Sequence, residues 1–214
     1  MELFHAYPFN SYFSTSFVDT DVLTKPELSL TRGWAKKRSL AFSTGRFCAR
    51  KALLSVGVNG PDILIGPGKE PLWPDDIVGS ISHSDNLAGA IVARSDKVKS
   101  LGLDIETLGK VQEDIWGLVF TPREQTFLKR FDSEQIDLYS TLIFSVKECF
   151  YKLQFPLTKT YLDFKDVEIS LAESGIKLTF VSQDSSLEQM FLNLTIEYLL
   201  YEKEVITCAY LIEE

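Results

Sequence analysis

Gly102-Leu103-Asp104-Ile105-Glu106 is the stretch that decides how this chain folds. Polar and apolar side chains alternate in it, and a period of two residues is typical of a β-strand. Side chains at positions i and i+2 share one face of a strand, so Asp104 and Glu106 point the same way and the intervening apolar residues point the other way. Two carboxylates on one face offer the hard oxygen ligands that Mg²⁺ prefers. Gly102 lies on the same face and is expected to leave room for a ligand.

Two further stretches carry groups suited to chemistry on a phosphate. Ser80-Ile81-Ser82-His83 ends an apolar run in polar residues, and Phe144–Lys152 carries Glu148 and Lys152 one helical turn apart. A divalent cation, a carboxylate and a lysine together suit the cleavage of a phosphate ester. Each group also has a purely structural interpretation. The strand carboxylates could face solvent, Glu148 and Lys152 could be a surface ion pair, and His83 could be a structural histidine.

Length and composition restrict the class of protein. The chain has 214 residues, of which 45% are hydrophobic and 24% charged, as is usual for a globular protein with a sizeable core. No apolar run approaches the ~20 residues that cross a bilayer. The stretch Met1–Tyr7 lacks a basic region followed by an apolar one, so we expect a cytoplasmic protein without a membrane span. We expect its three cysteines, Cys48, Cys149 and Cys208, to be reduced and buried.

The charge is unevenly distributed along the chain. A net charge of −8 argues against nucleic-acid binding. Yet no acidic residue lies between Leu28 and Pro61. The basic residues of this segment, seven of the 22 in the chain, are Arg32, Lys36, Lys37, Arg38, Arg46, Arg50 and Lys51. A basic element on an acidic protein suits a compact polyanion, and arginine binds phosphate oxygens in pairs. The same pattern also fits a solvated basic helix.

Hydrophobic periodicity and end signals divide the chain into two similar halves. Long helices are predicted at 31–57 and 133–153, and a shorter helix begins at Thr121, with Pro122 and Glu124 as further start signals. The predicted strands are 78–82, 87–93, 101–106, 167–171, 176–181 and 192–212, the last with a turn near 202–203. A hairpin turn is predicted at Glu173-Ser174-Gly175. One long helix and a few strands in each half predict an α+β protein with two similar lobes.

Five motifs, which occur within residues 38–165, are similar to those of a known family. They are Gly45–Leu53, Glu70–Pro74 leading into Gly79–His83, Gly102–Glu106, Phe144–Lys152 and Phe155–Lys159. In this order they resemble the 4′-phosphopantetheinyl transferase superfamily in its larger, two-lobed type. The resemblance is greatest to the branch of enterobactin synthase component D.

The resemblance implies a fold and a reaction. The fold would be a pseudo-dimer of two α+β lobes, each a long helix packed on a small, mostly antiparallel sheet, with the active site in the cleft between them. Residues 1–100 would contact the phosphates of coenzyme A, and residues 101–214 would carry the metal ligands and the catalytic helix. The reaction would move the 4′-phosphopantetheine group of coenzyme A to a serine of an apo acyl, peptidyl or aryl carrier protein, releasing adenosine 3′,5′-bisphosphate. Siderophore, polyketide and non-ribosomal peptide pathways use such carriers. We expect the enzyme to be a monomer.

The resemblance also implies roles for individual residues. Asp104, Glu106 and Glu148 would hold Mg²⁺, or Mn²⁺, against the pyrophosphate. Asp104, Glu148 and Lys152 would be catalytic: Glu148 is the favoured base for the incoming serine, with a water as the open alternative, and Lys152 would neutralise the cleaved phosphate. The implied coenzyme A contacts are Arg38, Arg46, Lys69, Ser82, His83, Asp104, Glu148 and Lys152. Ile65 stands where related sequences often carry a basic residue, which leaves the nucleotide contacts less defined.

Two other functions fit the same residues. One is a Mg²⁺-dependent phosphohydrolase acting on a nucleotide, and the other is a non-catalytic module that binds coenzyme A. The presence of all three carboxylates and the lysine disfavours the second. We expect a carrier protein to dock between Thr107 and Phe131, with Trp116, Leu118, Val119 and Phe120 in an apolar anchor. These aromatic residues could instead belong to the core of the second lobe.

Overall fold

A computed structural model describes residue 1 and residues 7–173, 175–182 and 185–213 of the chain. The first half contains β1 (Asn10–Ser14), η1 (Thr20–Val22), α1 (Lys25–Leu30), α2 (Lys36–Leu54), β2 (Ile77–His83) and β3 (Ala88–Arg94). The second half contains β4 (Val98–Thr107), η2 (Glu113–Ile115), α3 (Trp116–Val119), α4 (Pro122–Leu128), α5 (Ser133–Thr158), β5 (Val167–Ala172), β6 (Gly175–Phe180), α6 (Ser185–Met190), β7 (Thr195–Tyr201) and β8 (Glu204–Ile212).

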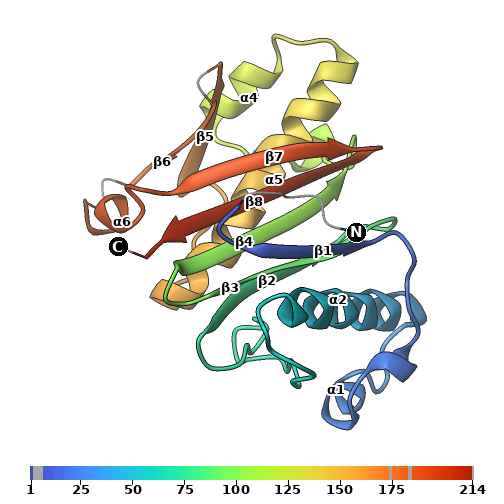
Figure 1. Cartoon of the computed structure of the whole chain (residues 1–214). Coiled ribbons are helices and arrows are strands. Elements are labelled where there is room, and N and C mark those ends of the chain that lie inside the picture. Colours follow the sequence, from blue (N-terminus) through green and yellow to red (C-terminus); the bar gives the residue numbers. More distant parts are fainter. Residues whose placement is uncertain (2–6, 174, 183–184, 214) are drawn as a thin grey trace.

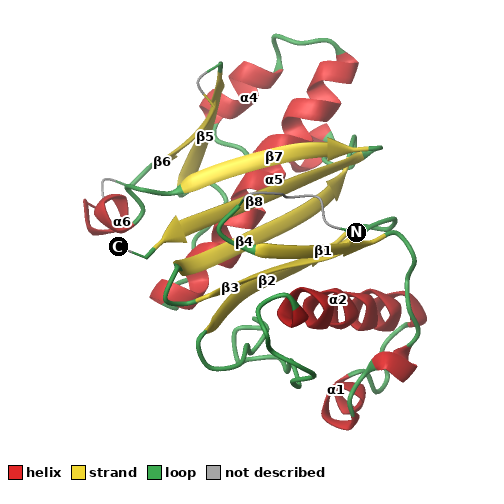
Figure 2. Cartoon of the chain, in the orientation of Figure 1, coloured by secondary structure: helices red, strands yellow, loops and turns green. Residues whose placement is uncertain are grey.

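The strands form three antiparallel sheets, in the orders β1-β3-β2, β4-β8-β7 and β5-β6. The two three-stranded sheets lie face to face, with α2 packed against the outer face of the first and α5 against the outer face of the second (Figure 1). The helices are therefore on the outside and the strands between them (Figure 2). The predicted α+β class and the arrangement as two similar lobes are confirmed.

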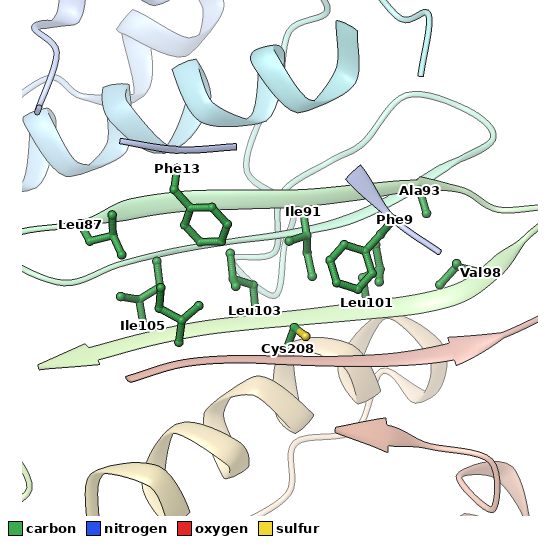
Figure 3. Packing of buried hydrophobic residues seen from close by; sticks show 11 residues of the cluster. Phe9, Phe13, Leu87, Ile91, Ala93, Val98, Leu101, Leu103, Ile105 and Cys208 are labelled. Carbon is green, nitrogen blue, oxygen red and sulfur yellow. The ribbon is translucent and has the colours of Figure 1, made fainter. Parts of the chain in front are cut away.

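The face between the two sheets is the largest apolar surface that the lobes share. Phe13 and Ile91 reach into it from the first sheet, and Leu103, Ile105 and Cys208 reach into it from the second (Figure 3). Alternation along β4 after its register shift between Val98 and Ser100 explains this placement, because Leu101, Leu103 and Ile105 face the first sheet and the even-numbered residues between them face α5. One strand thus supplies both the lobe interface and the carboxylate face expected from the sequence.

A buried ion pair with a capping threonine holds the first lobe together. Thr24 caps α1 in a capping box with Glu27, whose side chain is fully buried. Glu27 also accepts hydrogen bonds from the Arg50 guanidinium on α2 and from the backbone N–H of Ile63, each at 2.9 Å. With its oxygens occupied, the carboxylate tolerates burial.

The second lobe repeats this arrangement, and its cation again follows the buried glutamate by 23 positions. Thr121 caps α4 in a capping box with Glu124. The Lys147 ammonium of α5 donates to Glu124 at 2.7 Å, and the backbone N–H of Ile169 donates to the other carboxylate oxygen at 2.7 Å. The repeated cap, cation and backbone donor, at matching positions before and after each long helix, support the description of the lobes as two copies of one plan.

Some element boundaries differ from those predicted. The first long helix begins at Lys36 instead of residue 31, because a separate capped helix, α1, ends at Leu30. The second continues to Thr158, one turn past its predicted end, with Lys159 in the left-handed conformation behind it. β1 was not predicted, and it pairs with the central strand β3. Residues 2–6 of the N-terminal stretch and Ser174 of the predicted hairpin turn lie outside the described residues. No helix in the described part of the chain is long and apolar enough to span a bilayer.

Candidate active site

The candidate site is centred on three side chains from three different elements. The Lys152 ammonium of α5 donates to Asp104 Oδ1 of β4 at 2.7 Å and to Ser82 Oγ of β2 at 2.9 Å. Ser82 Oγ in turn donates to the same carboxylate oxygen at 3.1 Å. Because β2 belongs to the first lobe and β4 and α5 belong to the second, this cluster, named here the Lys152 cluster, joins the two lobes at one point.

Small residues allow these three elements to approach one another. The Ser80 hydroxyl of β2 accepts a hydrogen bond from the backbone N–H of Leu103 at 3.0 Å, so the two strands cross closely. A Cβ atom at Gly102 would clash with the carbonyl oxygen of Cys149 on α5. The expectation that Gly102 leaves room for a ligand is therefore wrong: the missing side chain makes room for the backbone of α5.

Burial and neighbouring charges raise the pKa of Glu106 and of Glu148. Burial, and then the charge of Asp104, raise the pKa of Glu106 to about 7. Burial also raises the pKa of Glu148, against the effect of the Lys152 ammonium. Burial disfavours the charged form of Lys152, but the charges of Asp104 and Glu148 outweigh it and raise the pKa of the lysine. Three carboxylates thus share one ammonium group, which leaves an excess of negative charge in the cleft.

The metal ligands expected from the sequence can be tested on this geometry. Within residues 7–173, 175–182 and 185–213, no three His, Cys, Asp or Glu side chains are assembled closely enough to hold a metal ion. Lys152 and Ser82 both donate hydrogen bonds to Asp104 Oδ1. The other oxygen, Asp104 Oδ2, is buried and has no hydrogen-bond partner. The unpaired oxygen and the excess negative charge fit a hard divalent cation chemically, although the three carboxylates do not converge.

A cavity of about 670 Å³ opens beside the Lys152 cluster and lies between the lobes. Its walls come from β2, from the start of β4, from the second half of α5 and from the loop Gly68–Trp73. Three residues of the predicted site line it, namely Lys69, Glu148 and Lys152. The prediction that the charges of α5 face a cleft is confirmed. The size is that of a small-molecule site.

Contacts between the lobes close the end of this cavity that lies farther along α5. Lys159, just after α5, forms an ion pair with Glu70 of the first lobe at 3.3 Å. The Tyr161 hydroxyl donates to the Gly68 carbonyl at 3.5 Å, and Gly68 lies directly against the ring of Phe155. The contact between Glu70 and Lys159 could not be predicted, because no local sequence pattern indicates a contact between positions so far apart in the chain.

Three predicted phosphate-binding residues of the first lobe, Arg38, Arg46 and His83, lie outside this cavity, whereas Lys69 lines it. Arg46 is 7% exposed, and its Nε donates to the Ile63 carbonyl at 2.9 Å. Arg38 is exposed, and His83 is exposed at the end of β2, directly after Ser82. None of the three contributes to the hydrogen bonds of the Lys152 cluster. Arg50, which lies in the same basic segment as Arg46, forms an ion pair with Glu27 and stabilises the fold.

The expected carrier anchor is largely wrong. Trp116 is 4% exposed and Phe120 is fully buried, and both belong to the core of the second lobe. The Trp116 indole donates to the Val111 carbonyl at 3.3 Å. Leu118, at 70% exposure, is the one residue of the expected anchor that reaches the surface. The interpretation of these aromatic residues as core residues is the correct one, because η2, α3 and α4 fold over the start of α5.

Comparison with known proteins agrees with the fold. Residues 27–93 match the family model of the 4′-phosphopantetheinyl transferase N-terminal domain, and residues 100–208 match that of the 4′-phosphopantetheinyl transferase superfamily. These matches cover both lobes. The chain belongs to the 4′-phosphopantetheinyl transferase superfamily.

The similar proteins include several named transferases. The chain is 38% identical to the 4′-phosphopantetheinyl transferase PptT of Mycobacterium tuberculosis, over 72% of this chain and 68% of that protein. It is 37% identical to Svp of Streptomyces mobaraensis, over 63% and 55% respectively. It is 33% identical to enterobactin synthase component D of Salmonella austin, over 65% and 57%. The chain thus matches little more than half the length of several curated relatives.

Among solved structures, the chain is similar to the holo-(acyl-carrier-protein) synthase of Bacillus anthracis in complex with CoA (3′,5′-ADP). The TM-score is 0.43 at 14% identity, and the match covers 55% of this chain and 99% of that one. At this level of similarity the comparison adds nothing to the description of the site.

Proposed function

We propose that this protein transfers the 4′-phosphopantetheine group of coenzyme A to a serine of an apo carrier protein and releases adenosine 3′,5′-bisphosphate. The observation that carries the proposal is the Lys152 cluster, in which an ammonium, a buried aspartate and a serine from both lobes meet beside a cavity of about 670 Å³. The names of the relatives support the same reaction, and those named enterobactin synthase component D favour a carrier of siderophore biosynthesis.

The residues present can be assigned to the steps of this transfer. The carrier serine oxygen attacks the phosphorus that bears pantetheine, and the bond from that phosphorus to the bridging oxygen of the pyrophosphate breaks. Glu148 accepts the serine proton, and burial raises the pKa of its carboxyl group, which makes it a stronger base than a solvated glutamate. Lys152 is placed to offset the charge on the phosphate oxygens, and alignment of the two reactants supplies much of the rate.

We further propose that Asp104, Glu106 and Glu148 hold Mg²⁺, or Mn²⁺, when coenzyme A is bound. The bound ion would neutralise charge on the pyrophosphate. The buried, unpaired Oδ2 of Asp104 and the raised pKa of Glu106 support a cation at this place. Arg38, Arg46, Lys69, Ser82 and His83 are proposed to hold the phosphates of coenzyme A.

The two lobes are proposed to divide these tasks. Residues 1–100 would bind the phosphates of coenzyme A, and residues 101–214 would supply the metal ligands and the catalytic helix. The boundary falls within β4, the strand that carries Asp104 and also packs against the first sheet. A monomer is therefore sufficient to form the site, since both lobes belong to one chain.

Intact-mass spectrometry of several apo carriers, each incubated with the protein, Mg²⁺ and coenzyme A, tests the function. We expect at least one carrier to gain the mass of one phosphopantetheine group, and we expect Glu148→Gln to abolish this gain. Glu188→Gln makes the same change at an exposed position of α6 and should leave the transfer unaltered. Cleavage of coenzyme A without a gain in carrier mass would identify a phosphohydrolase. Binding of coenzyme A without any turnover, unaffected by Glu148→Gln, would identify a non-catalytic module.

A further inference from the structure

Aromatic and cationic side chains alternate along one face of α2 at four-residue intervals. In order they are Trp34, directly before the N-cap, then Arg38, Phe42 and Arg46. The guanidinium carbon of Arg38 lies 4.1 Å from the centroid of the Trp34 ring, and that of Arg46 lies 4.1 Å from the centroid of Phe42. The two rings meet edge to face, with centroids 5.3 Å apart and planes at 88°. The four side chains form one continuous stack, named here the α2 ladder.

Arg46 is a buried cation that forms no ion pair with an acidic residue among the described residues, although the charge of Glu27 acts on it. Its side chain donates one hydrogen bond, to the Ile63 carbonyl, and none of the ion pairs in the described part of the chain includes it. Arg50, one turn farther along the helix, is paired in the usual way: its guanidinium forms an ion pair with the Glu27 carboxylate. A buried charge is normally paired, so the charge of Arg46 is available to an anion that arrives from outside.

The α2 ladder runs beside the segment that carries Ser82 and His83. Near its start, Lys37 forms an ion pair with Asp85 at 2.7 Å, in the turn that follows β2. Near its end, a Cβ atom at Gly45 would lie 2.8 Å from the side chain of Ile81, the residue before Ser82. The turns of α2 that carry the ladder therefore lie beside the part of β2 that joins the Lys152 cluster.

We infer that Trp34 and Phe42 are positioning residues, whose rings hold the Arg38 and Arg46 guanidinium groups in place for the 3′-phosphate of coenzyme A. The inference rests on the proposed function. A free arginine side chain loses rotamer freedom when it binds an anion, and a ring that already holds the guanidinium reduces that loss. Stacking occupies the flat face of the guanidinium and leaves N–H groups at its edge for phosphate oxygens, except the Arg46 Nε–H, which donates to the Ile63 carbonyl.

The test compares coenzyme A with dephospho-coenzyme A, which lacks the 3′-phosphate. In Phe42→Leu we expect the KM for coenzyme A to rise about 3- to 10-fold, the range of a cation–π contact that is partly shielded from water. The kcat and the KM for dephospho-coenzyme A should change by less than about twofold, since neither depends on the 3′-phosphate. Phe42→Tyr keeps the ring and should restore the KM for coenzyme A. Trp34→Leu, at a half-buried position before the helix, should act in the same direction and serves if Phe42→Leu does not fold.

Phe47→Leu is the matched control. Phe47 lies on α2 and carries the Lys51 ammonium 5.5 Å from its ring centroid, but it packs in the core and lies outside the α2 ladder. The substitution should lower the melting temperature and leave the ratio of the two KM values unchanged. If Phe42→Leu behaves like Phe47→Leu, or raises both KM values equally, Phe42 serves the fold alone and the inference is overturned.

Direct binding separates this inference from the proposed function. Calorimetry with adenosine 3′,5′-bisphosphate and with adenosine 5′-monophosphate needs no carrier and no turnover. We expect the wild type to prefer the bisphosphate and Phe42→Leu to lose about 3- to 10-fold of that preference. An unchanged preference overturns the inference even if the wild type is an active transferase. A reduced preference supports it even if no tested carrier is modified.

Discussion

At the scale of single residues, Asp104 has the most demanding position in the molecule. It is 2% exposed, one of its oxygens holds Lys152 and Ser82, and the other has no partner. A buried carboxylate oxygen without a donor is costly unless something else compensates it. Binding of a cation, which would offset the negative charge of the pyrophosphate, is the role that accounts for this arrangement under the proposed function.

Asp104→Asn removes the charge and keeps the shape of the side chain. We expect kcat for phosphopantetheine transfer to fall about 100-fold or more, because the proposed metal ion and the Lys152 ammonium, the two cations that would offset the pyrophosphate charge, lose the carboxylate that holds them. The melting temperature should stay within a few degrees, since the amide oxygen can still accept from Lys152. Carrier mass gain over time measures the rate. Asp96→Asn, at an exposed position between β3 and β4, is the control. A rate within a few-fold of wild type at saturating Mg²⁺ would remove Asp104 from the site.

The cysteines give a second residue-scale prediction, in which pH has a defined effect. Cys48 is fully buried, and burial raises the pKa of its thiol to about 12. Burial likewise raises the pKa of Cys149 and Cys208. Only the thiolate reacts with an alkylating reagent, and a raised pKa lowers its fraction at pH 8.5. We therefore expect no alkylation of the native protein at this pH and three alkylations in denaturant, counted by mass. A rapidly modified native thiol would show that the core opens locally.

Individual residues also mark the limit of prediction from sequence. Glu148, Lys152 and the strand carboxylates are recognisable because their spacing alone fixes which side chains share a face. Gly102 was misassigned because what fills its missing side chain is the backbone of α5, nearly fifty residues farther along the chain. Trp116 was misassigned for a similar reason. Sequence alone does not show whether an apolar residue in a short, irregular segment is buried, because the helices that cover it come from other parts of the chain.

At the scale of elements, the buried ion pair of Glu124 and Lys147 ties α4, α5 and β5 together. The Lys147 ammonium also donates to the carbonyl oxygens of Val119 and Phe164, at 3.0 and 2.6 Å, so all its protons have acceptors. Glu148 follows it directly on α5. The pair therefore fixes the rotation of the helix turn that presents the proposed base to the cleft.

Lys147→Met tests this role. The substitution leaves Glu124 buried without its cation, which costs about 3 kcal/mol or more of unfolding free energy. Urea unfolding measures the loss. Lys129→Met, at an exposed position at the end of α4, should change the unfolding free energy by no more than about 0.5 kcal/mol. If Lys147→Met is as stable as the control, the pair contributes nothing to the placement of α5.

Elements with strong local signals are predictable from the sequence, and those without them are not. The cap at Thr121 and the long apolar stripe of α5 specify their helices locally. β1 has no such signal: only five residues long, it exists because the central strand β3 offers it an edge to pair with. α1 is the exception: it was missed although Thr24 and Glu27 form the same local capping signal as Thr121 and Glu124.

At the scale of the whole molecule, the sequence predicts two lobes but not how they are joined. The residues of the shared face come from β1, β3, β4 and β8, which lie at opposite ends of the chain (Figure 3). No local pattern distinguishes an apolar face that meets the other lobe from one that meets its own helix. The structure shows that the interface is a hydrophobic core in its own right, and the Lys152 cluster lies where β2 of one lobe meets β4 and α5 of the other.

A shared core of this kind predicts that the two lobes unfold together. Leu103 is fully buried at the centre of the interface, next to Asp104. Leu103→Ala should cost about 3 kcal/mol and lower a single calorimetric transition by about 6–12 °C, because the cavity it creates belongs to both lobes. Leu54→Ala, at a position 50% exposed at the end of α2, should shift the same transition by no more than a few degrees. Two separate transitions in the wild type, or a Leu103→Ala variant that melts in two steps with one unchanged, would mean that the lobes fold independently. The cleft would then be a contact between two domains, and the Lys152 cluster could open without unfolding either of them.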